Sequence, residues 1–227
     1  MPESYDDLVQ KAGRVAGIVP WAQIDIMDGE FTPSSSWPYG KKNQETFAQL
    51  LKSKKELPFW EEISYEIDLM VTHPEKVVRD FVLLGARRII VHIESVKALR
   101  PLIASVQKGS FEEGECAIDE PVEFGLAFSI DTPFDRLREY MYEVDVVQLM
   151  GIEKIGFQGE PFSERVISRI RDLRAEYPHL IISVDGGVNR ASAPRLIEAG
   201  ADRLVSGSAV FSSSNVEEAI ASLAQQR

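Results

Sequence analysis

The sequence predicts an α/β fold of parallel strands, a TIM (β/α)8-type barrel to which this chain contributes seven strands. Short runs of aliphatic and β-branched residues alternate with longer stretches that carry apolar residues every three or four positions. Glycines separate several stretches from the next run, and no change of composition marks a second domain. We therefore expect a single (β/α) barrel domain over residues 1–227. An open, doubly wound sheet is the alternative.

Seven runs are nearly all apolar, as strands buried on both faces should be. The expected strands are Ala22–Met27, Ser64–Val71, Arg88–Ile93, Val122–Ser129, Val144–Met150, Leu180–Asp185 and Arg203–Ser206. Helices are expected where apolar residues recur at helical spacing. These are Glu75–Leu84, Phe134–Tyr142, Ser163–Glu176, Ala193–Ala199 and Val216–Gln225.

Residues at the ends of these stretches agree with the alternation. Gly85 and Gly200 each end a helical pattern and lead directly into a strand. Pro133 and Pro161 each stand just before a helical stretch, where proline suits the first turn. The order of strands and helices is therefore that of repeated βαβ units.

The beginning of the chain departs from a complete barrel. Its first recognisable element is a helix near Tyr5–Val15, which leads into the strand at Ala22. A closed barrel of eight strands needs one more strand, so strand 1 is missing, and we expect an upstream in-frame segment to encode it. Otherwise the barrel is open, and its two unpaired edges would favour association into a homo-oligomer.

Composition restricts the class of protein. The chain is 44% hydrophobic and 27% charged with a net charge of -11, which suits a soluble enzyme and disfavours nucleic acid or an anionic membrane as partner. No apolar run approaches the roughly 18–20 residues of a membrane span, and the acidic start is unlike a signal peptide. The single cysteine, Cys116, allows no internal disulfide and is taken as incidental, so we expect a cytoplasmic location.

Two segments read as long loops. Ser110–Pro121 is acidic, contains glycine and has no counterpart elsewhere, so we expect a surface excursion. Thr32–Lys42 follows the first strand and should lie on the catalytic face, where it could act as a lid or be an ordinary long loop.

Three carboxylates interrupt otherwise apolar strands: Asp25, Asp68 and Asp185. A buried carboxylate is costly unless it is paired or bound to a cation. A single one would be read as a structural hydrogen-bond acceptor. Three on separate strands favour a metal site or an acid/base site, because polar residues at strand ends form the active sites of barrels.

Small residues follow the last two strands. Gly186-Gly187 and Gly207-Ser208 stand where backbone N–H groups at helix starts can hold an anion. Barrels often bind phosphate between these two loops, whereas either loop alone would be read as a tight turn. A third glycine loop, Gly156 to Gly159, could close over the phosphate.

Taken together and in order, these segments resemble the ribulose-phosphate 3-epimerase family. The resemblance runs from near residue 5 to near residue 211 and rests on short motifs shared with that family. They are Asp25-Ile26-Met27-Asp28-Gly29, Asp68-Leu69-Met70-Val71, Gly85-Ala86 through Val91-His92-Ile93-Glu94, Asp131-Thr132-Pro133, Gly156-Phe157-Gln158-Gly159, Val184 to Val188 and Ala199 to Phe211.

The resemblance implies an isomerase that interconverts D-ribulose 5-phosphate and D-xylulose 5-phosphate by moving the C3 proton through an enediolate. Asp25 and Asp185 would be its two catalytic acid/base groups, one on each face of the sugar. Met27, Met70 and Met150 would line the substrate, although each could equally be core packing. Residues implied to bind phosphate or substrate are Gly156, Phe157, Gln158, Gly159, Gly186, Gly187, Gly207 and Ser208.

Departures from the family pattern fall at the same positions. Gln23 and Asp68 replace the two histidine ligands of the family, so the implied metal site is Gln23, Asp25, Asp68 and Asp185. Such an oxygen-rich set favours Mg2+ or Mn2+ over zinc or iron, and could also hold no metal. The loop from Met150 to Gly156 is one residue longer than in the family and lacks its proline, and Ser129 replaces an asparagine.

These departures leave alternatives open. The chain could be a catalytically impaired barrel that binds a phosphosugar, or an epimerase of another phosphorylated ketose. A Schiff-base aldolase or a phosphosugar decarboxylase would need a lysine inside the barrel mouth, and no expected strand carries one. His92 matches a family histidine, and we expect it to be a satisfied interior group.

Overall fold

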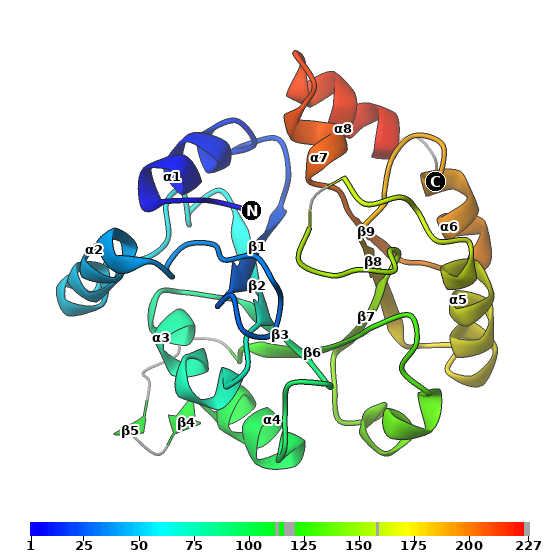
Figure 1. Cartoon of the computed structure of the whole chain (residues 1–227), viewed down its shortest axis with the longest axis horizontal. Coiled ribbons are helices and arrows are strands. Elements are labelled where there is room, and N and C mark those ends of the chain that lie inside the picture. The colour runs from blue at the N-terminus through cyan, green and yellow to red at the C-terminus, as the bar shows by residue number, and fades with distance from the viewer. Residues whose placement is uncertain (112–113, 116–120, 158, 225–227) are drawn as a thin grey trace. The chain divides into compact units, whose positions relative to one another are not determined.

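A computed structural model describes residues 1–111, 114–115, 121–157 and 159–224 (Figure 1). Its main sheet has seven strands, in the order β1-β2-β3-β6-β7-β8-β9. This matches the predicted number of strands. The chain forms two compact units, Met1–Gly125 and Leu126–Arg227, and the boundary falls inside β6 (Glu123–Phe128).

The first unit contains three complete strands of this sheet, with helices along one side of them (Figure 1). Its strands are β1 (Trp21–Met27), β2 (Ser64–Met70) and β3 (Arg88–His92). Its helices are α1 (Tyr5–Gly13), α2 (Lys41–Ser53), the 3-10 turn η1 (Pro74–Lys76), α3 (Val78–Leu83) and α4 (Leu99–Lys108). The predicted excursion carries β4 (Ser110–Phe111) paired antiparallel with β5 (Gly114–Glu115), whereas Cys116 lies outside the described residues.

Strand register places the polar residues of the first unit on one face. β1 and β2 run parallel with Asp25 opposite Asp68 and Met27 opposite Met70, and Glu66 of β2 is opposite Arg88 of β3. Since side chains alternate along a strand, these residues share a face and the intervening aliphatic residues occupy the other. All five residues of β3 are buried, as expected for a strand covered on both sides.

The loop after β1 is packed into the core. Trp37 has no exposed surface, and its ring lies 5.4 Å from Phe47 and 6.4 Å from Phe81 between ring centroids. The Ser36 hydroxyl donates to the carbonyl of Asp25 (2.7 Å) and accepts from the N–H of Met27 (2.9 Å). For Thr32–Lys42, the sequence left open a lid or an ordinary long loop. These contacts are those of an ordinary, ordered loop.

The second unit contains the later strands and their helices, with α5 and α6 along one side of the strands (Figure 1). The strands are β7 (Val146–Met150), β8 (Ile181–Asp185) and β9 (Arg203–Val205). The helical segments are the 3-10 turns η2 (Phe134–Arg136) and η3 (Arg138–Tyr140), then α5 (Arg165–Glu176), α6 (Ala193–Ala199), α7 (Ser208–Phe211) and α8 (Val216–Ala224). Gly200 ends α6 in the left-handed conformation, as predicted.

Three helical predictions need correction. The segment Phe134–Tyr142 is not an α-helix but two 3-10 turns, because it is short and its N–H groups bond three residues back. Helix α2 begins at Lys41, inside the stretch expected to be a loop. Helices α2, α4 and α7 are absent from the helices expected from sequence, although the apolar residues of α4 recur at helical spacing. None of the described helices is long and apolar enough to cross a membrane.

Candidate functional site

Two carboxylates stand opposite each other in the first unit. Asp25 of β1 and Asp68 of β2 are register partners, Asp68 has no exposed surface, and Asp25 is partly exposed. Gln23 donates from its side-chain amide to Oδ1 of Asp25 at 2.8 Å. Burial raises the pKa of the Asp25 carboxyl, and repulsion from Asp68 adds to the rise. Asp25 and Asp68 are among the aspartates whose oxygens could hold a metal ion.

Two methionines lie one step further along the same strands. Met27 and Met70 are register partners and are 1% and 3% exposed. Each is two residues beyond its aspartate and therefore on the same face. The register thus brings the two predicted substrate-lining methionines beside the carboxylate pair.

Asp28 ties the end of β1 to the end of β2. Its Oδ2 accepts the N–H of Thr72 at 2.7 Å, and its Oδ1 accepts those of Glu30 (2.8 Å) and Phe31 (2.9 Å). Partial burial acts to raise the pKa of Asp28, but these backbone hydrogen bonds outweigh it and lower the pKa. The second aspartate of the signature is therefore a structural clamp.

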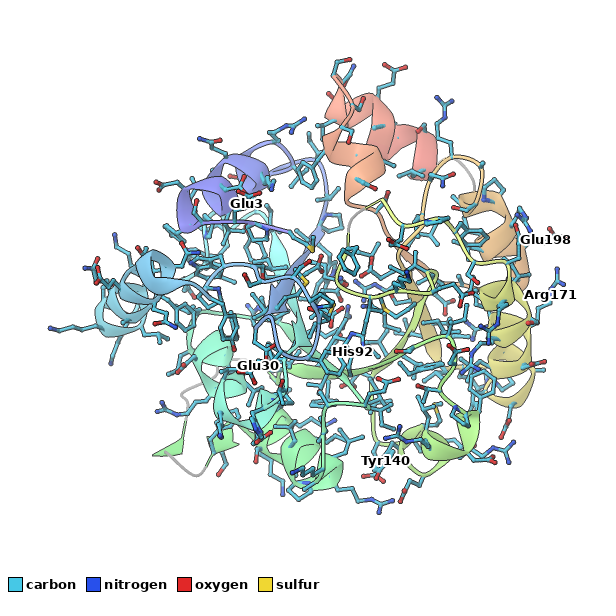
Figure 2. The ribbon with its side chains drawn as sticks, viewed as in Figure 1. Glu3, Glu30, His92, Tyr140, Arg171 and Glu198 are labelled. Atoms are coloured by element: carbon cyan, nitrogen blue, oxygen red, sulfur yellow. The ribbon has the colours of Figure 1, made fainter. Side chains whose placement is uncertain are left out.

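His92 lies in the interior at the end of β3 (Figure 2). It has no exposed surface, its Nε2 is 3.4 Å from Oδ1 of Asp68, and its Nδ1 is 3.7 Å from Oε2 of Glu94. Burial alone would lower the pKa of His92, but the two carboxylates outweigh it and raise the pKa to about 10. His92 is interior as predicted, but the expectation that its ring nitrogens are satisfied by hydrogen bonds is wrong. Neither contact, however, has the length of a normal hydrogen bond.

The third predicted carboxylate is in the second unit, at the end of β8. Asp185 is partly exposed and stands opposite Met150 of β7 in the strand register. The N–H of Gly151 donates to the carbonyl of Asp185 at 2.7 Å, which holds the end of β7 against that of β8. The predicted methionine of β7 is buried (3% exposed).

The turn after β8 requires its glycines. Gly186 and Gly187 have φ of +91° and +67°, which side-chain-bearing residues rarely adopt. A Cβ on Gly186 would lie 2.8 Å from Ile152, and one on Gly187 would lie 2.8 Å from Cα of Phe162. The backbone after β8 is therefore packed closely under the loop that follows β7.

The turn after β9 is more open. Gly207 and Ser208 are exposed, and a Cβ on Gly207 would have no heavy atom within 4 Å among the described residues. The Ser206 hydroxyl donates to the carbonyl of Val188 at 3.0 Å, so the loops after β8 and β9 lie together. The second unit by itself thus places the two predicted anion-binding turns side by side.

The loop after β7 contains the third predicted glycine segment, Gly156 to Gly159. Gly156 and Gly159 have positive φ, and Phe157 is 43% exposed, while Gln158 lies outside the described residues. A pocket of about 340 Å³ borders this loop, lined by Glu153, Lys154, Glu160, Pro161, Phe162, Ser163, Glu164 and Arg165. Arg165 is paired with Asp131 and Glu153, and three glutamates line the pocket, so its charge does not suit phosphate.

Comparison with known proteins agrees with the motifs. The sequence profile of the ribulose-phosphate 3 epimerase family matches residues 4–211. The chain belongs to this family. The ribulose-phosphate 3-epimerases of Treponema pallidum and Chlamydia pneumoniae are 32% and 34% identical to it, over 85% and 83% of this chain and 79% and 74% of their own lengths. Membership supports an epimerase acting on a carbohydrate phosphate.

Solved structures agree on the fold. The chain is similar to 3-hexulose-6-phosphate synthase from Salmonella typhimurium (TM-score 0.67, 11% identity, 100% of this chain and 95% of that one). It is also similar to a ligand complex of KGPDC from Streptococcus mutans (TM-score 0.68, 12% identity, 99% and 92%). Both are TIM-barrel enzymes, so the predicted fold class is confirmed. At such identity the likeness concerns the fold alone.

Two contacts of the candidate site are not predicted by the sequence analysis. The clamp role of Asp28 was not assigned, although its place before a glycine in a turn is typical of a side chain that accepts backbone N–H groups. The approach of His92 to Asp68 was also missed. Nothing in either strand alone predicts that contact, because it depends on how β2 and β3 are paired.

Proposed function

We propose that this chain interconverts D-ribulose 5-phosphate and D-xylulose 5-phosphate, and that its two units act together as one cytoplasmic barrel domain. The observation that carries the proposal is Asp25 of the family signature, held opposite Asp68 by the strand register in a chain that matches the family over residues 4–211. Its relatives in Treponema pallidum and Chlamydia pneumoniae are named as ribulose-phosphate 3-epimerases, which supports the same reaction. β1 and β9 are the terminal strands in the order of the sheet, and exposed strand edges would favour association into a homo-oligomer.

Asp25 and Asp185 would carry the proton transfer. One carboxylate removes the proton from C3, next to the C2 ketone, and the electron pair moves to the ketone oxygen to form an enediolate. The other carboxyl returns a proton to the opposite face of C3, and the enediolate collapses to the epimeric ketone. Inversion without a redox cofactor needs one such group on each face. The raised pKa of Asp25 suits a group that must hold a proton during part of the cycle.

A divalent cation fits the residues around Asp25. We propose Asp25, Asp68 and Asp185 as ligands, residues whose oxygens could hold a metal ion, with the carbonyl of Gln23 as the fourth. Burying the adjacent Asp25 and Asp68 is unfavourable for two negative charges, and a cation would offset it. Because all these ligands are oxygens, Mg2+ or Mn2+ suits them better than zinc or iron. When bound, the cation supplies electrostatic stabilisation of the enediolate oxygens.

The phosphate of the ketose would bind at the turns of the second unit. Backbone N–H groups around Gly186, Gly187, Gly207 and Ser208 are the proposed donors, with Gly156 to Gly159 closing over them. The close packing under Gly186 and Gly187 keeps this backbone rigid, whereas the space beside Gly207 is open. The residues Met27, Met70 and Met150 would line the sugar and exclude water.

The activity is tested by following the C3 proton of D-ribulose 5-phosphate in D2O by NMR. Samples contain Mg2+, Mn2+ that is removed before the spectra are recorded, or a chelator. We expect metal-dependent loss of the C3 proton signal together with the appearance of D-xylulose 5-phosphate. Asp25→Asn and Asp185→Asn should each abolish the formation of D-xylulose 5-phosphate, while the exposed Glu30→Gln makes the same change of charge and should not. A folded wild-type protein without exchange would refute the proposal.

The phosphate site is tested separately with Gly207→Ala. Because the added Cβ meets no heavy atom within 4 Å among the described residues beyond its own chain neighbours, the thermal midpoint should stay within about 2 °C of wild type. The KM for D-ribulose 5-phosphate should rise about tenfold, ~1.4 kcal/mol, and inhibition by inorganic phosphate should weaken to match. An unchanged KM and unchanged phosphate inhibition would place the anion elsewhere.

One observation favours a second function, a phosphosugar-binding barrel with impaired catalysis. Gln23 replaces a family histidine and its amide is bonded to Oδ1 of the proposed base Asp25. A protein that binds D-ribulose 5-phosphate in calorimetry but shows no C3 exchange would support this alternative, or an epimerase of another phosphorylated ketose.

A further inference from the structure

His92 is a buried polar side chain that the proposed reaction does not use. It ends β3 on the face that carries Arg88, four residues earlier, and its ring has no exposed surface (Figure 2). A carboxylate flanks each ring nitrogen: Asp68 is 3.4 Å from Nε2, and Glu94 is 3.7 Å from Nδ1. An imidazole removed from water and aimed at a carboxylate costs free energy unless the contact serves folding or function.

The ring is held in place by parts of the chain that do not depend on Asp68. Phe31 packs on it with 5.4 Å between ring centroids. The N–H of Phe31 is in turn bonded to Asp28, the clamp that also holds Thr72 at the end of β2. The imidazole is thus fixed by packing and by its strand, and can act as a rigid support.

The geometry points to one role for this support. We infer that His92 is a positioning residue that fixes the rotation of the Asp68 carboxylate, and so the direction in which that side chain presents its oxygens to a divalent cation. This rests on the proposed function in that Asp68 is taken as a metal ligand. Gln23 contacts Asp25 on the neighbouring strand by a hydrogen bond to Oδ1 at 2.8 Å, a shorter contact than the 3.4 Å between His92 and Asp68. Groups that orient metal ligands in this way typically change affinity by about 10–100-fold when removed.

The same arrangement explains how Asp68 can stand where the family has a histidine. A carboxylate has a shorter side chain than an imidazole and rotates more freely about its last bond, so it needs an outside contact to be held in one orientation. His92 provides that contact from the neighbouring strand, and Glu94 lies 3.7 Å from its other ring nitrogen.

The test compares three replacements of His92 by the Mn2+ dissociation constant, read from the EPR signal of free Mn2+. His92→Phe keeps a ring against Phe31 but removes the ring nitrogen that faces Asp68, and His92→Asn keeps an amide that is too short to reach Asp68. We expect both to weaken Mn2+ binding at least tenfold. His92→Gln can place an amide near the position of Nε2 and should stay within threefold of wild type. The exposed His73→Gln is the matched control and should change nothing.

Kinetics give a second readout. If the protein epimerises D-ribulose 5-phosphate, at a saturating metal concentration His92→Phe should lower kcat while leaving the KM within about twofold, since the phosphate turns are untouched. A merely structural role would instead lower the thermal midpoints of all three variants and leave the Mn2+ affinities of the folded fractions alike.

Several results would overturn the inference. Folded His92→Phe and His92→Asn that bind Mn2+ as tightly as wild type would do so, as would a wild-type protein with no measurable Mn2+ affinity. If His92→Phe fails to fold, the contrast between His92→Asn and His92→Gln decides the same question. Absence of C3 exchange alone would count against the proposed reaction, and the Mn2+ affinities would still decide the role of His92.

Discussion

Replacing Arg88 with methionine tests whether an ion pair at the start of β3 stabilises the first unit. Arg88 is 4% exposed, and its Nη1 is 2.7 Å from Oε2 of Glu66, which is 2% exposed. Its Nε donates to Oε2 of Glu123 at 2.7 Å, and its guanidinium lies 4.4 Å from the centre of the Trp21 ring. The arginine thus joins β3 to three other strands, β1, β2 and β6.

The expected cost follows from the burial of these groups. Methionine keeps the length of the side chain but leaves the carboxylate of Glu66 buried without its arginine, and breaking such a pair costs about 3–5 kcal/mol. The pair with Glu123 adds at most about 1 kcal/mol, because the Glu123 side chain is 44% exposed. We therefore expect Arg88→Met to lower the free energy of unfolding by about 3–5 kcal/mol at pH 7.

The assay is urea unfolding followed by circular dichroism and tryptophan fluorescence. Arg165→Met is the matched control, because Arg165 also pairs with two carboxylates but its side chain is 55% exposed, so its loss should cost about 0.2–1 kcal/mol. Adding Glu66→Gln to Arg88→Met should recover part of the loss, since the uncompensated charge is then gone.

A cost below about 1 kcal/mol for Arg88→Met, equal to that of the exposed control, would refute this reasoning. So would additive effects of Arg88→Met and Glu66→Gln. Additivity would mean that the two side chains do not interact across β2 and β3, despite their direct register pairing.

Three further changes have defined outcomes. Asp28→Asn should lower the free energy of unfolding by about 1.5–3 kcal/mol at pH 7. Because the native pKa of Asp28 is lowered, its stabilising contribution is full above the unfolded pKa near 4 and is lost as the pH falls through the native pKa. The difference in stability between variant and wild type should therefore shrink in acid, whereas Glu30→Gln should show no such change. Gly187→Ala should lower stability by about 2 kcal/mol or more, seen as a lower thermal midpoint, since φ is +67° and the added carbon meets the backbone of the neighbouring loop. Trp37→Ala should lower the free energy of unfolding in urea by about 3–5 kcal/mol, because it removes a fully buried ring. Trp37→Phe should cost clearly less, because the buried indole N–H has no hydrogen-bond partner among the described residues, and equal costs for the two variants would contradict this reasoning.

Much of the fold follows from local patterns. Runs such as Arg88–His92 are apolar on both faces except for one or two residues, which identifies them as central strands of a parallel sheet. Glycine after a helical pattern marks the helix end, as at Gly200. Weaker patterns gave two wrong predictions, one of a helix that does not form and one of a loop where a helix begins. Phe134–Tyr142 has helical spacing but forms 3-10 turns, and α2 begins in a stretch whose prolines and serines suggested a loop.

The sequence alone identifies which residues of the candidate site are polar and which strands or turns carry them. Asp25, Asp68 and Asp185 stand out because a carboxylate in an apolar strand is costly, whatever the rest of the chain does. The glycine turns after β8 and β9 stand out for a similar reason, since Gly186 and Gly187 adopt backbone angles that other residues avoid. These are local requirements, and the sequence alone expresses them.

Contacts between strands could not be obtained in this way. Asp25 is opposite Asp68, and His92 approaches Asp68, because of the register of β1, β2 and β3. A shift of one residue would turn every side chain to the other face, and the packing of the whole unit selects one register. Local sequence therefore determines which residues are polar and where each strand runs, whereas the packed structure determines which polar groups meet, because their separation depends on residues far apart in the chain.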